Sequence, residues 1–380
     1  MNCPVIVGSE REEVSAVKSK NSRVPKNFLH ACKNPLSGLV LMPPKKNCKE
    51  ELLSGIPDNN RCMIFPDIVT QIDGRGYALA VKGVGAKTPL YGSSPLDFAF
   101  PRNFGEEKNG LIDARKITNE LWFGESPYGA QGEICADYSL KITELANGCN
   151  INGFYICPVI EVNEFPEETK DKTYWYRRYL GQYLQEQRLM PSNIRLYHQS
   201  ELTLGRNTAE VLNLFNITTA DELDGFIDNY ISSGVAALTL FVRTMEGSKF
   251  GFIGLDYTDV WLDKDSVLAP DGTIHFADIE GLEWVVAGQD WTLEERVRFQ
   301  FERNFYEFMY CLDILLRERA RLTSSYSSIE DLRSTLAIRL EIALARDSFL
   351  KCESSKNSVN IVVKPPIGAI DVPIRVLDLR

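Results

Sequence analysis

The segment VKGVGAKTPLYG, residues 81–92, ends an apolar run with a cation, Lys82, and continues with Gly83 and Gly85. Glycine allows a ligand to approach the backbone closely, and a lysine ammonium is a frequent partner of phosphate. Two interpretations follow from this pattern. Lys82 is either a phosphate-binding lysine at the end of a buried strand or simply the solvated end of that strand.

A second segment, residues 254–284, places acidic residues on both sides of an expected hairpin. Asp278 follows an apolar strand-like run, as the metal-binding aspartate of kinases does. Asp259 lies upstream of the hairpin, where a catalytic loop would fall. A calcium loop of the EF-hand type is not supported, because its glycine and terminal glutamate are missing at the required spacing. The alternative is a solvated acidic loop made of Asp256, Asp259, Asp263 and Asp265.

Transfer of a group from a nucleoside triphosphate depends mainly on positioning and charge, so it needs few residue types. These are a strand lysine for the phosphates, a helix glutamate that fixes the lysine, and acidic or amide groups for metal and base. Lys82 is the candidate lysine, and Glu133, near the start of the next expected helix, is the candidate glutamate. A glutamate in the first turn of a helix is also favourable against the helix dipole, whatever its other role.

The elements that must position these residues follow a two-part order. Strand patterns bounded by Gly, Pro or Asn predict strands at residues 61–69, 76–84 and 153–162. Helical spacing predicts a helix within residues 129–148, closed by Gly148. Past residue 170 the pattern is mainly helical. The helices expected there lie at residues 173–187, 219–245, 292–322 and about 328–350, with a short hairpin at 265–279 and an extended tail at 359–380.

This order predicts an α+β, bilobal protein-kinase-like fold with a β-rich N-lobe, one key helix and a mainly α-helical C-lobe. The expected parts are an N-terminal extension (1–60), the N-lobe (61–165) with an insertion at about 93–127, the helical C-lobe with the catalytic hairpin (166–350) and a C-terminal tail (351–380).

Composition excludes several classes of protein. The net charge of −10 argues against a nucleic-acid binder, because phosphate affinity comes mostly from lysine and arginine. No apolar run is long enough for a membrane span or a secretory signal, and the nine cysteines form no CxxC pair. We therefore expect a cytoplasmic protein with reduced, buried thiols and no membrane or nucleic-acid partner. Only three histidines are present, so the chemistry must rest on carboxylates, lysines and arginines.

Several segments, in order, resemble the protein adenylyltransferase SelO family, a branch of the protein-kinase-like superfamily. DGRG (73–76) followed by AVKGVGAKTP is similar to the family's DGR segment and LKGAGxTPYSR motif. QGEICADYSLKITELANGCNINGFYICP is similar to its REF-helix and the strand after it. RLMPSNIR resembles RVxPSHIR, and FIGLDYTDVW resembles the HGVxNTDN loop. The resemblance covers roughly residues 70–285 as dispersed motifs.

The resemblance implies roles for individual residues. Lys82, with Gly83 and Gly85, would contact the nucleotide, and Glu133 would be the ion-pair glutamate. Arg188 and Arg195 would hold ATP in a flipped pose that exposes its α-phosphate, a task suited to the planar donor fork of arginine. Asp259 would be the catalytic aspartate, and Asp278 would bind metal.

The chain departs from the family at three points. The interval from Lys82 to Glu133 is longer than usual, which leaves Glu120 as an alternative helix glutamate. Val260 stands where the family has a metal-binding asparagine, so either Asp265, the preferred substitute, or Asp263 replaces it, or metal binding is impaired. The long C-terminal region of the family is also shorter here.

The expected function is therefore an ATP- and Mg²⁺-dependent transfer of AMP to a Ser, Thr or Tyr hydroxyl of a protein substrate. One alternative is a kinase that transfers phosphate to a protein or a small-molecule acceptor. Another is a nucleotide-binding pseudokinase scaffold, which Val260 favours. A nucleotide-free interaction protein is the remaining interpretation.

Overall fold

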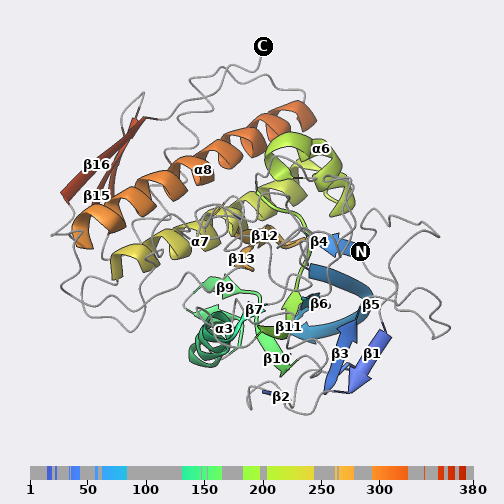
Figure 1. The fold of residues 1–380 in the computed structure, drawn as a ribbon. Coiled ribbons are helices and arrows are strands. Elements are labelled where there is room, and N and C mark those ends of the chain that lie inside the picture. The colour runs from blue at the N-terminus through green and yellow to red at the C-terminus, as the bar shows by residue number, and fades with distance from the viewer. Residues whose placement is uncertain are drawn as a thin grey trace, which may run out of the picture. The chain divides into compact units, whose positions relative to one another are not determined.

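The structure is a computed structural model. It describes residues 15–18, 22–23, 34, 36–42, 56–58, 62–83, 131–146, 148–151, 153–164, 183–196, 203–243, 262, 265–277, 293–323, 338, 350–354, 358–363 and 368–373. These residues form several sheets and helices, which confirms the α+β class (Figure 1). The chain divides into two compact units, Met1–Gly148 with Cys157–Asn193, and Cys149–Ile156 with Ile194–Arg380.

The first unit contains an antiparallel sheet of seven strands. Its order is β2 (Ser22–Arg23), β10 (Val159–Glu164), β11 (Tyr183–Met190), β6 (Arg75–Lys82), β5 (Cys62–Ile72) and β4 (Ile56–Asp58), and β7 (Gln131–Gly132) also pairs with β11. A separate antiparallel pair joins β1 (Ser15–Lys18) to β3 (Leu39–Met42). The expected strands at residues 61–69 and 76–84 are confirmed as β5 and β6.

A two-residue turn joins β5 to β6. Asp73 and Gly74 both have positive φ, 51° and 79°, between the paired residues Ile72 and Arg75. Asp-Gly is a preferred sequence for such a turn, because both central residues must adopt a left-handed conformation. The geometry of the turn alone therefore explains why Asp73 and Gly74 occur at the start of the DGRG segment.

Helix α3 (Glu133–Leu145) confirms the helix expected within residues 129–148. Its end is set by Gly148, whose φ is 116° and whose N–H donates to the Thr143 carbonyl at 3.1 Å. One side of the helix packs on the sheet through a buried cluster. The cluster consists of Ala136, Val159, Val162 and Leu184, with Leu140 against it.

The helix expected at residues 173–187 is wrong in its last part, because Tyr183–Met190 is the strand β11. This strand lies inside the sheet, and Gln185, Glu186 and Gln187 are all buried. The amide of Gln187 donates to the carbonyls of Leu36 and Leu39, both at 3.1 Å. Partners that lie this far away in sequence satisfy polar groups which a sequence pattern would assign to a solvated helix face.

The second unit contains a four-stranded sheet of order β12 (Ser266–Leu268), β13 (Ile274–Phe276), β9 (Phe154–Ile156) and β8 (Asn150–Ile151). The strand expected over residues 153–162 is therefore two strands that belong to different units, β9 and β10. The break falls at Cys157-Pro158, between Ile156, which pairs with Phe276, and Val159, which pairs with Arg188.

Three helices and a further sheet complete the described part of the second unit. They are α6 (Leu204–Leu214), α7 (Ala220–Arg243), α8 (Leu293–Leu322), β14 (Leu350–Ser354), β15 (Ser358–Val363) and β16 (Gly368–Pro373). The expected hairpin at 265–279 and the helices at 219–245 and 292–322 are thereby confirmed over their described residues. The extended tail is confirmed at residues 359–363 and 368–373. The helix expected at about 328–350 lies outside the described residues except for Ile338 and for Leu350, which begins β14.

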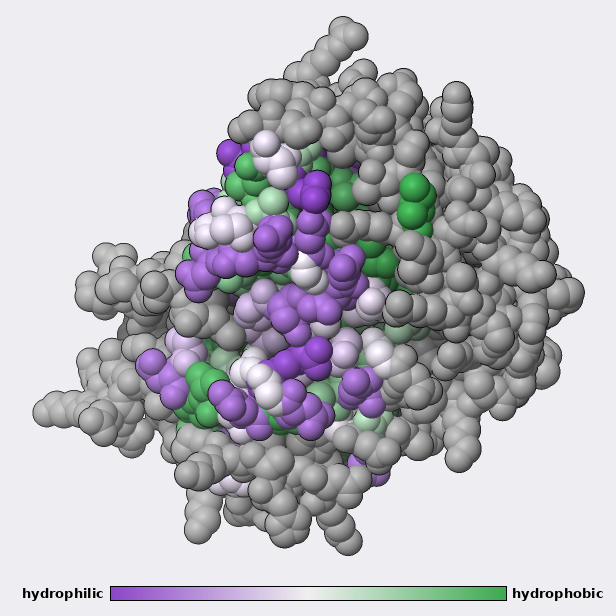
Figure 2. Space-filling view, turned by 180° about the vertical axis from the view of Figure 1, so that it is seen from behind, coloured by the Kyte–Doolittle hydropathy of each residue, from purple (hydrophilic) through white to green (hydrophobic). Residues whose placement is uncertain are grey.

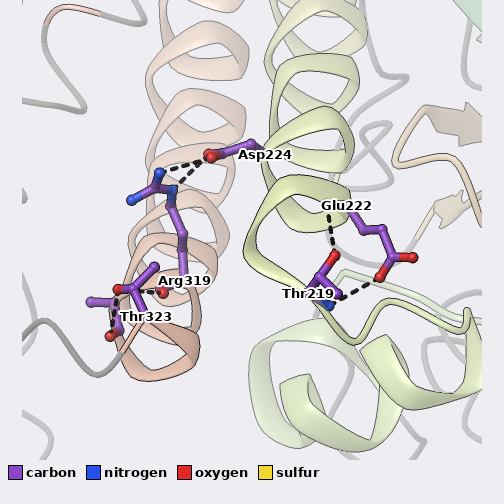
Figure 3. Close-up of polar contacts among 6 residues, drawn as sticks. Thr219, Glu222, Asp224, Arg319 and Thr323 are labelled. Atoms are coloured by element: carbon purple, nitrogen blue, oxygen red, sulfur yellow. Dashed lines mark hydrogen bonds and ion pairs between the residues drawn. The ribbon is translucent and has the colours of Figure 1, made fainter.

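Helices α7 and α8 pack closely along their length. The rings of Tyr230 and Phe308 stack with centroids 5.1 Å apart, and the Tyr230 hydroxyl donates to the Phe308 carbonyl at 3.1 Å. Burial raises the pKa of the Tyr230 hydroxyl above its usual range. Near the helix ends, the guanidinium of Arg319 donates to both oxygens of Asp224 at 2.7 and 2.8 Å (Figure 3).

A capping box begins α7. The Thr219 N–H donates to Glu222 Oε2 at 3.0 Å, and the Glu222 N–H donates to Thr219 Oγ1 at 3.3 Å (Figure 3). The N–H groups of Thr218 and Thr219, which both donate to Glu222 Oε2, lower the pKa of the Glu222 carboxyl. The carboxylate therefore stabilises this helix start above the ordinary glutamate pKa, and the contribution is lost as pH falls through the lowered one.

The described surface gives little sign of a large apolar patch. Figure 2 shows a face on which the described residues are mostly hydrophilic, with hydrophobic residues in small groups. The exposed large hydrophobic residues among those described are Val69, Tyr306 and Ile338. In this part of the chain, no helix combines the length and apolar character needed to cross a membrane. The expected buried thiols are confirmed at four positions, Cys62, Cys149, Cys157 and Cys311.

Candidate functional site

Lys82 ends the strand β6 and is buried, with only 5% of the residue exposed. This excludes the interpretation of Lys82 as a solvated strand end. In the ladder it lies opposite Glu186 of β11 on one side and Cys62 of β5 on the other. Residues directly opposite each other in a sheet point to the same face, with Cβ atoms about 4.5–5.5 Å apart. Lys82 and Glu186 are therefore close neighbours.

Arg188 lies two residues beyond Glu186 on β11 and so shares that face. Its guanidinium binds the Glu186 carboxylate, with Nε donating to Oε1 at 2.6 Å and Nη2 donating to the same oxygen. Both residues are buried, at 3% and 0% exposure. Burying two charged groups costs much free energy unless they are paired and hydrogen-bonded to each other, as these two are.

Helix α3 covers the same face of the sheet. Val159 and Val162 pair with Arg188 and Glu186 in the ladder, and both valines belong to the cluster that packs on α3. The short strand β7 pairs with β11 directly beyond the last residue of β6, because Gln131 lies opposite Leu184 while Lys82 lies opposite Glu186. Each two-residue step along a strand spans about 6.8 Å.

Glu133 begins α3 immediately after β7 and is half-buried. The first unit therefore places Lys82 and Arg188 on one face of one sheet, and helix α3, which begins at Glu133, packs on that face. These three residues come from three separate segments of the sequence. The ladder and the α3 cluster give the physical reason why these segments meet.

Gly83 follows Lys82 with a φ of 104°, a conformation that favours glycine. Its carbonyl accepts a hydrogen bond from the buried side-chain amide of Gln185 at 3.1 Å. Gln185 thus fixes the direction in which the chain leaves β6. Gly85, two residues further on, lies outside the described residues.

Arg195 and Asp265 lie close together within the second unit. Arg195 forms an antiparallel bridge with Val267, and the Leu268 N–H donates to the Ile194 carbonyl at 2.7 Å. Asp265 precedes Val267 by two residues, and diagonal neighbours across such a pairing lie about 7–8 Å apart. Both Arg195 and Asp265 are buried.

Asp278 and Asp259 lie outside the described residues, as do Glu120, Val260, Asp263 and the expected insertion at 93–127. The chain just before Asp278 is nevertheless fixed, because the Ala277 N–H donates to the Asp265 carbonyl at 2.7 Å. Asp265 and the chain leading into Asp278 are therefore adjacent. Carboxylate oxygens are the ligands that Mg²⁺ prefers, so these two residues suit that ion chemically. Among the described residues, no group of three or more potential ligands for a metal ion is found.

Leu262, which lies between Asp259 and Asp265 in the sequence, is held by two hydrogen bonds. The Leu262 N–H donates to Asn304 Oδ1 of α8 at 2.6 Å, and the Ser266 hydroxyl donates to the Leu262 carbonyl. All three residues are buried. The sequence pattern did not single out Asn304, because an asparagine inside a helix has no local signal for a partner 42 residues away.

The sequence pattern also missed Glu186 and Gln185. The available signal was the run Gln185-Glu186-Gln187-Arg188, in which polar residues occupy both faces of a possible strand. Read at helical spacing, the same run suits a solvated helix, so alternation alone could not identify it.

Comparison with known proteins gives no further assignment. No protein-family model matches this sequence, and no curated protein is similar to it.

Proposed function

We propose that this chain is an ATP- and Mg²⁺-dependent transferase of bilobal protein-kinase-like fold. It moves AMP from ATP to a Ser, Thr or Tyr hydroxyl of a protein, which breaks the bond between the α- and β-phosphates and releases pyrophosphate. One observation carries the proposal. Buried Lys82 and Arg188 share a sheet face with the helix that begins at Glu133. A strand lysine with a glutamate on the following helix is the arrangement by which protein kinases hold the phosphates of ATP.

The order of the strands supports the kinase-like fold. β4, β5 and β6 are consecutive antiparallel strands, and Lys82 closes the third of them, the position of the phosphate lysine in protein kinases. In the second unit, the hairpin of β12 and β13 directly precedes Asp278, as a strand precedes the metal-binding aspartate of kinases.

Each residue then has a defined task. Lys82, Arg188 and Arg195 neutralise the triphosphate, Glu133 fixes Lys82, and the backbone at Gly83 and Gly85 lets phosphate approach. Asp259 orients the acceptor hydroxyl or removes its proton. Asp265 and Asp278 would hold Mg²⁺, which when bound would neutralise charge on the phosphates.

Transfer of AMP, and not of phosphate, rests on the resemblance of RLMPSNIR to the paired-arginine segment of the adenylyltransferases. The guanidinium of Arg188 is held by Glu186, and the backbone of Arg195 pairs with Val267. The planar donor fork of arginine suits the holding of phosphates in a pose in which the α-phosphate faces the acceptor.

A nucleotide-binding scaffold without catalysis is the second candidate. The observation that favours it is Val260, which cannot ligate metal at the position where an asparagine is expected. In that case ATP would bind with an affinity that does not depend on Mg²⁺.

The deciding experiment uses ATP labelled separately on the α- and γ-phosphates, with the wild type and the Asp278→Ala variant. We expect label from the α-phosphate to enter protein covalently with the wild type only. Label from the γ-phosphate would indicate a kinase. ATP binding without transfer of either label would favour the scaffold, and absence of binding by the folded wild type would contradict the proposal.

A further inference from the structure

The proposed function gives no role to Glu186, although the environment of its carboxylate is unusual. It is fully buried at 0% exposure, in the middle of the sheet, and opposite Lys82 in the ladder. Its Oε1 accepts two N–H groups of Arg188, while its Oε2 has no hydrogen-bond partner among the described residues. A buried carboxylate oxygen without a donor is uncommon and calls for an explanation.

We propose that Glu186 is the positioning residue of the phosphate-binding cations in this chain: it holds the guanidinium of Arg188 in place beside Lys82 so that both cations can receive the same triphosphate. This inference rests on the proposed function. It differs from the role of Glu133, because Glu186 acts from the sheet and mainly through Arg188.

The geometry of the guanidinium supports this role. Arginine has two planar edges with parallel N–H donors, one formed by Nε and Nη2 and the other by Nη1 and Nη2. The first edge of Arg188 binds Glu186 Oε1. Binding through that edge fixes the plane of the guanidinium, and bidentate recognition of phosphate oxygens requires a planar donor fork with a fixed orientation.

Charge gives a second reason. Two buried cations on one sheet face, Lys82 and Arg188, would repel each other when no anion is bound. Glu186 lies opposite the first and binds the second, so it offsets this repulsion in the absence of nucleotide. The site can therefore remain folded and cationic before ATP enters.

A double-mutant cycle tests the inference. ATP affinity is measured by titration calorimetry, with Mg²⁺ present, for the wild type, Glu186→Gln, Arg188→Met and the double variant. Glutamine keeps the shape of the side chain but loses its charge, so it holds a guanidinium more weakly. We expect Glu186→Gln to weaken ATP binding by about 5- to 20-fold when Arg188 is present and by less than about twofold when it is absent.

Chemical unfolding of all four proteins serves as the control, because a purely structural role of the ion pair would lower stability without changing the ATP affinity of the folded protein. An equal loss of affinity with and without Arg188 would overturn the inference. Unchanged or tighter ATP binding by Glu186→Gln would also overturn it, and would indicate that the carboxylate competes with phosphate. If the folded wild type binds no ATP, the proposed function fails first, and the positioning role falls with it.

Discussion

At Lys82 two physical demands oppose each other. Burial disfavours an ammonium group, yet the ladder keeps Lys82 inside the sheet, opposite Glu186 and at the end of β6. A cation at such a position implies either a structural ion pair or a bound ligand, because one of these must offset the free-energy cost of desolvation. Arg188 and Glu186 on the same face form an ion pair, so the formal charge of the three residues is +1, which favours an anionic ligand.

Glu133 provides a prediction at the residue scale. Replacing Glu133 by glutamine removes the charge that is proposed to fix Lys82 without changing the size of the side chain. We expect the rate of label transfer from ATP to fall by up to about 100-fold, because a small displacement of a positioned group can cost that much. The measurement is incorporation of α-phosphate label into protein.

Glu144→Gln is the matched control, since Glu144 lies on the same helix and is exposed. It should leave the transfer rate unchanged. Equal rates for Glu133→Gln and the wild type would show that another carboxylate, such as Glu120 or Glu186, fixes the lysine.

At the scale of elements, the close packing of α7 on α8 requires a residue without a side chain at Gly234. A Cβ atom added at Gly234 would overlap the ring of Phe308, which stacks on Tyr230. Gly225 lies on the same helix, and a Cβ atom there would meet nothing within 4 Å. The two glycines therefore differ in what surrounds them and not in the type of element.

Alanine at these two positions should change stability in opposite directions. We expect Gly234→Ala to lower the free energy of unfolding by about 1–3 kcal/mol, because overpacking displaces the Phe308 ring. Gly225→Ala should raise it by about 0.5–1 kcal/mol, because alanine favours the helix at an open position. Urea unfolding of both variants measures this, and a loss of stability in both would contradict the described packing.

The elements that sequence patterns predicted well are those whose partners are near in sequence or uniformly apolar. Helix α3, the hairpin of β12 and β13, and the strands β5 and β6 belong to this group. The strand β11 does not, because its buried Gln187 is satisfied by carbonyls about 150 residues away. No local pattern carries that information.

The residues of the candidate site also differ in whether the sequence could predict them. Lys82 and Glu133 could be selected from residue type and spacing, and Arg188 from the family resemblance. Glu186 could not, because its significance comes from the register that sets it opposite Lys82. Register is decided by the whole sheet, and a shift of one residue would turn Glu186 to the other face.

At the scale of the whole molecule, the chain passes between two compact units three times. The crossings follow Gly148, Ile156 and Asn193, so β8 and β9 belong to the second unit although the first unit continues after them. The first of these passages follows α3 directly, and the last falls between Arg188 and Arg195. Each unit thus carries one arginine of the RLMPSNIR segment.

The account's central claim is that the face of the first unit bearing Lys82 binds a nucleoside triphosphate. The most direct test is a calorimetric titration of the full chain with ATP and Mg²⁺, comparing the wild type with Lys82→Met and with Arg75→Met, which removes a cation from the other end of the same strand. We predict that the wild type binds ATP, that Lys82→Met weakens binding by at least about tenfold, and that Arg75→Met changes it by less than about twofold. Binding of ATP to Lys82→Met as tightly as to the wild type, or no binding by the folded wild type, would contradict the claim.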